Sequence, residues 1–196
     1  MASDTRERIL DAALTSFAEK GYSGTNLIDI AKSVGIVKSA IYRHFSSKED
    51  LWNALISAME QYYEERFGCE KNLQKVQRAC EELIEMTMNM VDFTIHDSKV
   101  VRIRKILIME QFRDQRTNEL ATKHFLTGLE SMFTEVFARM MENGSIKQDD
   151  PKMLALTYTS PISALIQLCD REPEKEIEVL KKIKDFVQHF VKTYGV

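Results

Sequence analysis

The sequence predicts an all-α protein of about nine helices. Its 196 residues include only seven glycines and three prolines, so few positions interrupt a helix. Apolar residues recur every three or four positions over most of the chain, which is the spacing of one helical face. Hydrophobic residues make up 44% of the chain, enough for two cores. We expect a small domain over residues 1–48 and a larger helical bundle over residues 49–196, joined by a helix at 49–67.

The first helix is expected from about residue 5 to residue 20, where Ile9, Ala13 and Phe17 share one face. Gly21 ends this helix. Thr25 is a natural N-cap for a second helix that runs to about Val34, and its hydroxyl with the nearby free N–H groups suits a phosphate.

The second and third helices are spaced as a helix-turn-helix, a motif that reads DNA. Ala31 is small at a position where another helix must cross. Gly35 readily adopts the left-handed backbone conformation that ends a helix. Ile36 and Ile41 then supply apolar contacts for a steep crossing. The recognition helix is expected from about residue 37 or 38 to residue 44, without a side-chain cap at Val37.

The fourth helix is expected to open with a capping box formed by Ser46 and Glu49 and to end near Phe67.

Charge is segregated in this region although the whole chain has a net charge of −3. From Ile30 through Lys48 there is no acidic residue. The positive potential is therefore concentrated on the turn, the recognition helix and the start of the next helix, where phosphate would lie. The alternative is a helical hairpin with a solvated basic face. The basic residues of the segment are Lys32, Lys38, Arg43 and Lys48.

Residues from about 5 to 67 resemble the amino-terminal domain of the TetR family of transcriptional regulators. The resemblance covers the opening helix RERILDAALTSFAEKGY, the Thr25, Ile30-Ala31 and Gly35 pattern, and the block IYRHFSSKEDL. The rest of the chain is similar to that family only in length, helicity and helix order. The resemblance implies a regulator, most simply a repressor, that binds a double-stranded DNA operator and is released by a small-molecule effector.

Individual roles in DNA binding follow from position and from the resemblance. Four residues lie early and outward on the recognition helix and are candidates for base contacts: Lys38, Ser39, Ala40 and Arg43. Three others are expected to contact the phosphates of the DNA backbone, as matching positions do in relatives: Tyr42, His44 and Lys48. Tyr42 is alternatively a core aromatic residue, but Ile41 and Phe45 already occupy the inward positions.

The carboxy-terminal bundle is expected to contain five further helices. Their approximate ranges are 71–95, 98–113, 118–142, 151–170 and 174 onward. Asp150 before Pro151 marks the start of the fourth of these, and Pro161 should bend it.

The last two helices are amphipathic and suggest an intersubunit four-helix bundle, and relatives dimerise in that way. A twofold dimer presents two recognition helices about 34 to 36 Å apart and requires a near-palindromic operator. The residues expected at the homodimer interface are Leu165, Leu168, Leu180, Ile183, Val187, Phe190 and Val191.

Ten methionines and ten phenylalanines predict an adaptable interior that suits an apolar or aromatic effector. The alternative for each residue is ordinary core packing. Glu110 is either a buried acceptor for a cationic or hydroxylated ligand or an exposed helix-end charge. The candidate lining residues are Met86, Met90, Phe93, Met109, Glu110, Phe112, Phe125, Phe133 and Tyr158.

Other function classes are disfavoured. The four histidines lie far apart, without metal-ligand spacing, and nucleotide-binding and hydrolase motifs are missing, so we expect neither an enzyme nor a metal or cofactor. A helical adaptor without DNA binding is the remaining alternative. No apolar run is long enough for a membrane span and no signal-peptide core opens the chain, so we expect a cytoplasmic protein with buried thiols or, less simply, a redox-sensing cysteine.

Overall fold

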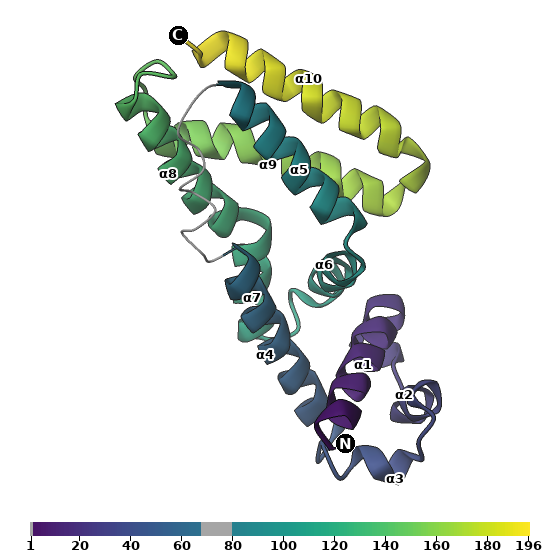
Figure 1. Ribbon diagram of the computed structural model, residues 1–196. Helices are drawn as coiled ribbons and strands as arrows, with labels where there is room; N and C mark the ends of the chain where they lie inside the picture. Colours follow the sequence, from purple (N-terminus) through teal and green to yellow (C-terminus); the bar gives the residue numbers. More distant parts are fainter. Residues whose placement is uncertain (1, 68–79) are drawn as a thin grey trace. The chain divides into compact units, whose positions relative to one another are not determined.

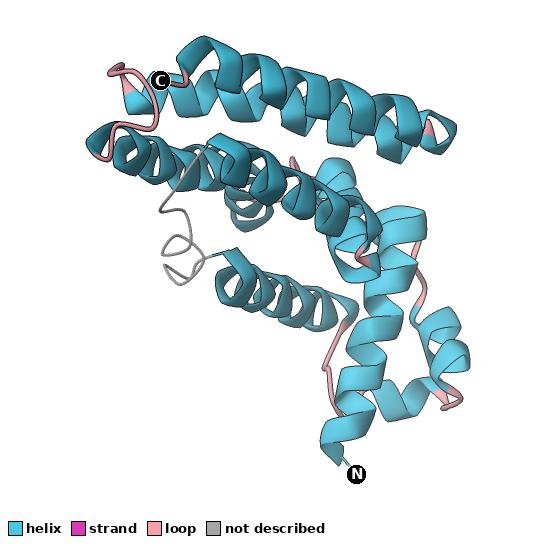
Figure 2. Cartoon of the chain, turned by 45° about the horizontal axis from the view of Figure 1, so that its top comes forward, coloured by secondary structure: helices cyan, strands magenta, loops and turns pink. Residues whose placement is uncertain are grey.

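A computed structural model describes residues 2–67 and 80–196 (Figure 1). Helices connected by short loops account for most of these residues, and the only β-type pairing among them is an isolated bridge between Ile146 and Gly195 (Figure 2). The predicted all-α class is confirmed. Within the described residues, no helix is both long and apolar enough to cross a membrane.

The chain forms two compact units, each described here by itself. Unit 1 contains Met1–Gly68 and Arg102–Ala121, and unit 2 contains Cys69–Val101 and Thr122–Val196. The boundaries of these compact units differ from the expected division between residues 48 and 49. The helix that begins at Lys48 belongs to unit 1, where arginines of the 102–121 segment form ion pairs with it. The division into a DNA-binding and a ligand-binding domain stays a prediction about function.

Unit 1 is built on the three amino-terminal helices and the long helix that follows them. Its core contains the fully buried side chains of Phe17, Ile30, Ile41 and Trp52. The elements are α1 (Ala2–Gly24), α2 (Leu27–Val34), α3 (Lys38–Ile41), α4 (Lys48–Phe67), most of α6 (Ser98–Glu110), and α7 (Gln115–Thr122) up to Ala121.

Gly21 interrupts α1 near the predicted position. Its φ of 67° and ψ of 177° lie in a region that is essentially restricted to glycine. A Cβ atom at this position would lie 2.9 Å from the Glu110 Oε1 atom, so the Glu110 carboxylate would have to shift.

The N-cap of α2 is Asn26, not Thr25 as expected. The Asn26 side chain accepts a 2.9 Å hydrogen bond from the Ile28 N–H. The buried Thr25 hydroxyl instead faces the carbonyls of Ser16, at 3.0 Å, and Gly21, at 2.8 Å. The sequence places two good capping residues side by side, and two carbonyls of α1 hold the first of them.

The cap of α4 is also displaced by one residue from the predicted capping box. The Ser47 hydroxyl accepts a 2.9 Å hydrogen bond from the Asp50 N–H, and the Asp50 carboxylate accepts a 2.7 Å bond from the Ser46 N–H. The expected pair of Ser46 and Glu49 is therefore wrong. Because Asp50 serves the cap, Glu49 is left to contact other parts of unit 1.

Unit 2 is a helical bundle around one apolar core. Its aromatic centre is formed by Phe133, Phe137, Tyr158 and Phe190, all buried. A π-helical segment at Lys123–Thr127 joins α7 to α8, where a single helix over 118–142 was expected. The elements of unit 2 are α5 (Cys80–His96), α8 (Gly128–Glu142), α9 (Pro151–Arg171), the short 3₁₀ turn η3 (Pro173–Lys175) and α10 (Glu176–Tyr194).

Two helix boundaries of unit 2 test the predictions directly. Asp150 caps α9 by accepting a 2.9 Å bond from the Lys152 N–H, and Pro151 occupies the first turn as predicted. The helix continues through Pro161 to Arg171. The expected helix at 71–95 corresponds to α5 from Cys80 onward; its first part and Cys69 lie outside the described residues.

Candidate nucleic-acid interface

The turn between α2 and α3 has the geometry that the sequence predicts. Ala31 is buried where α2 is crossed, and Gly35 adopts a φ of 75° and a ψ of 32°. The Ile36 N–H then donates a 2.9 Å hydrogen bond to the Ala31 carbonyl, which closes the end of α2. These contacts fix the direction in which the following segment leaves the turn.

The recognition segment begins with α3 at Lys38, and only four residues of it are α-helical. A hydrogen-bonded turn extends the recognition segment to His44, whose N–H donates to the Ile41 carbonyl at 2.9 Å. Val37 makes no side-chain cap, as predicted. Ile41 and Phe45 are buried, whereas Tyr42 is 47% exposed. Tyr42 therefore points outward, as its place between two inward residues predicts.

Most of the predicted DNA-binding side chains lie on the surface of this one segment. Lys38, Ser39, Tyr42 and Arg43 are exposed, and the Lys38 amine lies 5.9 Å from the centre of the Tyr42 ring. Ala40, His44 and Lys48 are half-buried. Thr25 is the exception, because its buried hydroxyl faces the carbonyls of Ser16 and Gly21 in α1. We do not retain Thr25 as a phosphate ligand.

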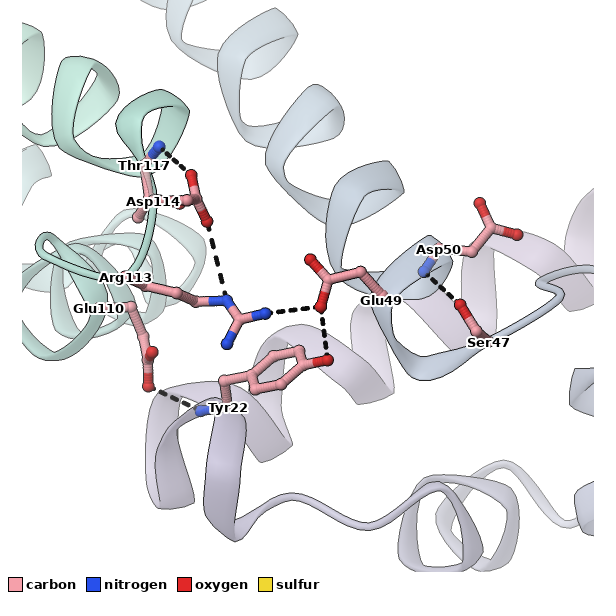
Figure 3. Close-up of polar contacts among 8 residues, drawn as sticks. All are labelled: Tyr22, Ser47, Glu49, Asp50, Glu110, Arg113, Asp114 and Thr117. Carbon is pink, nitrogen blue, oxygen red and sulfur yellow. Dashed lines mark hydrogen bonds and ion pairs between the residues drawn. The ribbon is translucent and has the colours of Figure 1, made fainter.

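Lys48, the first residue of α4, lies near Tyr22 together with a group of charged residues, of which Figure 3 shows Glu49, Glu110 and Arg113. Its amine lies 4.3 Å from the centre of the Tyr22 ring, and the Arg113 guanidinium carbon lies 3.4 Å from the same point. The Tyr22 hydroxyl donates a 2.7 Å hydrogen bond to Glu49, and the Tyr22 N–H donates a 2.7 Å bond to Glu110. Residues of α4 and of the 110–113 segment thus contact one aromatic ring.

Burial and neighbouring charges change the pKa values of this group. Partial burial lowers the pKa of Lys48, and the positive charge of Arg113 lowers it further. Partial burial raises the pKa of the Tyr22 phenol, and the hydrogen bond to the Glu49 carboxylate adds to that increase. Both shifts follow from the short distances among the ring, the two cations and the carboxylate.

Two arginines of α1 also belong to this region, and the sequence analysis did not identify them. The Arg6 guanidinium lies 5.0 Å from the centre of the Phe45 ring, at the end of the recognition segment. The Arg8 guanidinium donates a 2.7 Å hydrogen bond to the Val34 carbonyl at the end of α2. Their positive charges in the opening helix were a visible signal, but their distance in sequence from residues 30–48 concealed the contact.

The candidate effector-binding residues are divided between the two units. Met109, Glu110 and Phe112 belong to unit 1; Phe112 is 87% exposed, and the Glu110 carboxylate binds the Tyr22 N–H. The role of these three residues in effector binding stays a prediction. The other candidates lie in unit 2, partly or fully buried: Met86, Met90, Phe93, Phe125, Phe133 and Tyr158.

The candidate dimer residues include several that form the core of a single chain. Ile183, Val187 and Phe190 are buried within unit 2, so their side chains do not face outward as an interface requires. Amphipathicity located the apolar face of α10 correctly, but that face packs on its own chain. The remaining candidates are half-buried against the same core: Leu165, Leu168, Leu180 and Val191.

The fold and the exposed recognition segment define a helix-turn-helix protein. Residues 9–55 match the family described as "Bacterial regulatory proteins, tetR family". The amino-terminal domain of this chain is a TetR-family domain, and the resemblance predicted from the sequence is confirmed.

The comparisons extend this result in sequence over the amino-terminal domain and in fold over the whole chain. The chain is 46% identical over 57 residues to IcaR of Staphylococcus aureus strain Newman, a negative transcriptional regulator of the biofilm operon icaADBC. This match covers 29% of the chain and only 31% of IcaR.

Two solved structures share the fold along nearly the entire chain. A TetR-family regulator from Mesorhizobium loti MAFF303099 has a TM-score of 0.71 at 20% identity, with 100% of this chain and 99% of that chain covered. AibR, solved in complex with isovaleryl coenzyme A and operator DNA, has a TM-score of 0.63 at 16% identity, with coverage of 92% and 96%.

No group of three or more histidine, cysteine or carboxylate side chains is arranged to hold a metal ion within residues 2–67 and 80–196. Of the cysteines in these ranges, Cys80 is half-buried and Cys169 is buried.

Proposed function

We propose that this protein is a non-catalytic transcriptional regulator, most simply a repressor, that binds double-stranded operator DNA through residues 38–48. The observation that carries the proposal is the outward placement of Lys38, Tyr42 and Arg43 on a segment without acidic residues. Such a surface attracts phosphate, and its helix-turn-helix places side chains at base edges in the major groove. The likeness of the amino-terminal domain to IcaR supports repression.

Alanine substitution of backbone-contacting residues tests this proposal. Tyr42→Ala and Lys48→Ala should weaken binding to many duplex sequences by similar factors, because phosphate contacts carry no sequence information. Lys48→Ala should also lower the slope of log affinity against log salt by about 1. Lys184→Ala, which removes an exposed lysine of α10, is the matched control and should leave the slope unchanged. Unchanged affinity in both site variants would contradict the assignment.

We further propose that two chains associate through the outer face of α9 so that two recognition segments meet a near-palindromic operator. Met153 and Leu156 are exposed on α9, and the exposed small residues Ser160 and Ala164 continue the Leu156 row at four-residue spacing. Small side chains permit the close approach of a second helix. This face replaces Ile183, Val187 and Phe190 in the interface.

The substitution Ala164→Asp tests this interface without disturbing a buried side chain. It should yield monomers in sedimentation experiments, because two copies of the aspartate would meet near the twofold axis. Lys181→Asp, on the exposed side of α10, is the control. An Ala164→Asp dimer of wild-type affinity would show that another surface pairs.

The proposed effector is a small, largely apolar or aromatic molecule that binds within unit 2 and releases the operator. The half-buried, adaptable side chains of Met86 and Met90 pack against the aromatic core and support this chemistry. The Thr87 and Tyr158 hydroxyls form a buried 2.6 Å hydrogen bond with each other, and this pair offers the effector one polar contact. AibR supplies a precedent for the fold, since its structure contains both an acyl-coenzyme A and operator DNA.

The effector is tested by measuring release of labelled duplex while aromatic and acyl compounds are titrated. Met86→Ala should change the concentration needed for release and leave the affinity for DNA without effector unchanged. If no compound of these classes releases the duplex, the proposed chemistry is wrong.

A further inference from the structure

The carboxylate of Glu49 occupies an unexpected place for a DNA-contacting surface. Glu49 is the second residue of α4 and directly follows Lys48, which the proposed function assigns to the DNA backbone. An anionic side chain at this position opposes the approach of phosphate and is also a natural partner for the adjacent lysine. Its interactions therefore influence how strongly the surface attracts DNA.

The structure pairs Glu49 with Arg113 (Figure 3). The Glu49 Oε2 atom accepts a 2.6 Å hydrogen bond from the Arg113 guanidinium and a 2.7 Å bond from the Tyr22 hydroxyl. In the described part of the chain, the ion pair recorded for Glu49 is with Arg113, 64 positions away, and not with its neighbour Lys48. The carboxylate is thereby neutralised from within unit 1.

Arg113 is itself held firmly in this position. Its guanidinium carbon lies 3.4 Å from the centre of the Tyr22 ring and 5.4 Å from that of Trp52, and its Nε atom lies 3.7 Å from the Asp114 carboxylate. Asp114 is fixed in turn by a 2.8 Å hydrogen bond from the Thr117 N–H at the start of α7. Stacking and ion pairing together hold one guanidinium orientation better than either alone.

Lys48 lies in a different environment. Its amine lies 4.3 Å from the centre of the Tyr22 ring; burial and the Arg113 charge lower its pKa, and the Glu110 and Glu49 carboxylates oppose that decrease. A cation above an aromatic ring keeps its charge and hydrogen-bond donors for a further partner. A phosphate oxygen supplies the anion that the ring does not.

We propose that Arg113 is a positioning residue for the DNA-binding surface: by holding Glu49, it leaves Lys48 available to a backbone phosphate. The inference rests on the proposed function. Without Arg113, Lys48 becomes the nearest cation to Glu49, and pairing with Glu49 withdraws the Lys48 charge from the phosphate.

The test compares four proteins for binding to a fluorescent random-sequence duplex of about 30 base pairs over a salt series, since nonspecific binding reports the phosphate contacts. The proteins are the wild type, Arg113→Ala, Glu49→Gln and the double variant. Arg113→Ala should bind about tenfold more weakly near 0.1 M salt and have a slope smaller by about 1, the contribution of one phosphate contact. The double variant should regain the wild-type slope, because glutamine does not neutralise Lys48.

Arg116→Ala is the matched control. Arg116 also forms an ion pair with α4, but its partners are Glu60, the Ser57 hydroxyl and, at 3.5 Å, the Asn53 carbonyl, all more than one turn beyond Lys48. Its loss should leave the salt slope unchanged. Circular dichroism of every variant establishes that it is folded.

Rescue by Glu49→Gln separates positioning from a purely structural role. If Arg113 only supported the packing around Tyr22, the double variant would bind as weakly as Arg113→Ala, and the inference would be overturned. Wild-type affinity and slope in Arg113→Ala would also overturn the inference. If Tyr42→Ala then binds the duplex more weakly than the wild type, the proposed function is still supported. If the wild-type protein does not bind the duplex at low salt, the proposed function and the role of Arg113 are both refuted.

Discussion

The guanidinium of Arg8 donates a 2.7 Å hydrogen bond to the backbone carbonyl of Val34, the last residue of α2. The bond joins α1 to the helix that precedes the turn, 26 residues further along the chain. A positive charge at this end of a helix also compensates the partial negative charge of the unpaired carbonyls. Arg8 therefore stabilises the helix-turn-helix and does not need to contact DNA.

Arg8→Ala should lower the free energy of unfolding of the protein by about 1.5 kcal/mol, the usual contribution of a hydrogen bond to a charged group. Urea denaturation followed by circular dichroism measures the change. At temperatures where the variant is folded, the salt dependence of DNA binding should match that of the wild type. A stability within error of the wild type would show that water replaces the guanidinium without loss.

Arg6 lies only two residues before Arg8, but we expect it to contact DNA and to contribute little to stability. Its exposed guanidinium lies over Phe45 beside the proposed DNA-binding surface, so a phosphate can reach it. Arg6→Ala should weaken binding to all duplex sequences alike and lower the salt slope by about 1, with little change in stability. Arg8→Ala is the control for the loss of an arginine from α1. An unchanged slope in Arg6→Ala would place Arg6 outside the contact surface.

Gly21 should tolerate no side chain. Gly21→Ala combines an unfavourable backbone conformation, at φ 67° and ψ 177°, with a Cβ that would lie 2.9 Å from Glu110 Oε1. We expect a loss of about 2 kcal/mol in the free energy of unfolding. Gly24→Ala is the control, because its Cβ would meet only the Lys20 side chain, at 3.2 Å. Equal effects of the two substitutions would contradict the special role of Gly21.

The sequence was most informative where a local conformation allows few residue types. Gly35 and Ala31 predicted the turn because left-handed backbone and close helix crossing exclude larger side chains. The spacing of Ile41 and Phe45 likewise predicted that Tyr42 points outward, and its exposure confirms this orientation. These conclusions required no knowledge of distant parts of the chain.

Choices between equivalent neighbours depended on tertiary contacts and could not be predicted. The segment at residues 46–50 permits two overlapping capping boxes, and the structure uses Ser47 with Asp50. The other acid, Glu49, is held by Arg113 across 64 positions, and nothing local indicates that contact. The pattern on α10 similarly revealed an apolar face but not whether it packs on its own chain or on a second copy.

His96 should make the stability of unit 2 depend on pH. Its Nδ1 atom lies 2.9 Å from Asp92 and its Nε2 atom lies 3.1 Å from Glu176, so the ring joins the end of α5 to the start of α10. The hydrogen bond to Glu176 raises the pKa of His96; slight burial opposes this, and Asp92 adds to the increase. Both ring nitrogens donate only when the imidazole is protonated.

Because the pKa is higher in the folded state than the ordinary value of 6.5, the contribution of His96 is complete below that value and is lost as the pH rises through the folded pKa. His96→Ala should therefore reduce the free energy of unfolding by about 0.5 kcal/mol more at pH 5.5 than at pH 9, a small effect because the side chain is 49% exposed. Urea denaturation at the two pH values measures the difference. His189→Ala, which removes an exposed imidazole of α10, is the control for the loss of a histidine side chain. A larger loss at pH 9 would mean that the neutral ring, and not the imidazolium, stabilises the junction between α5 and α10.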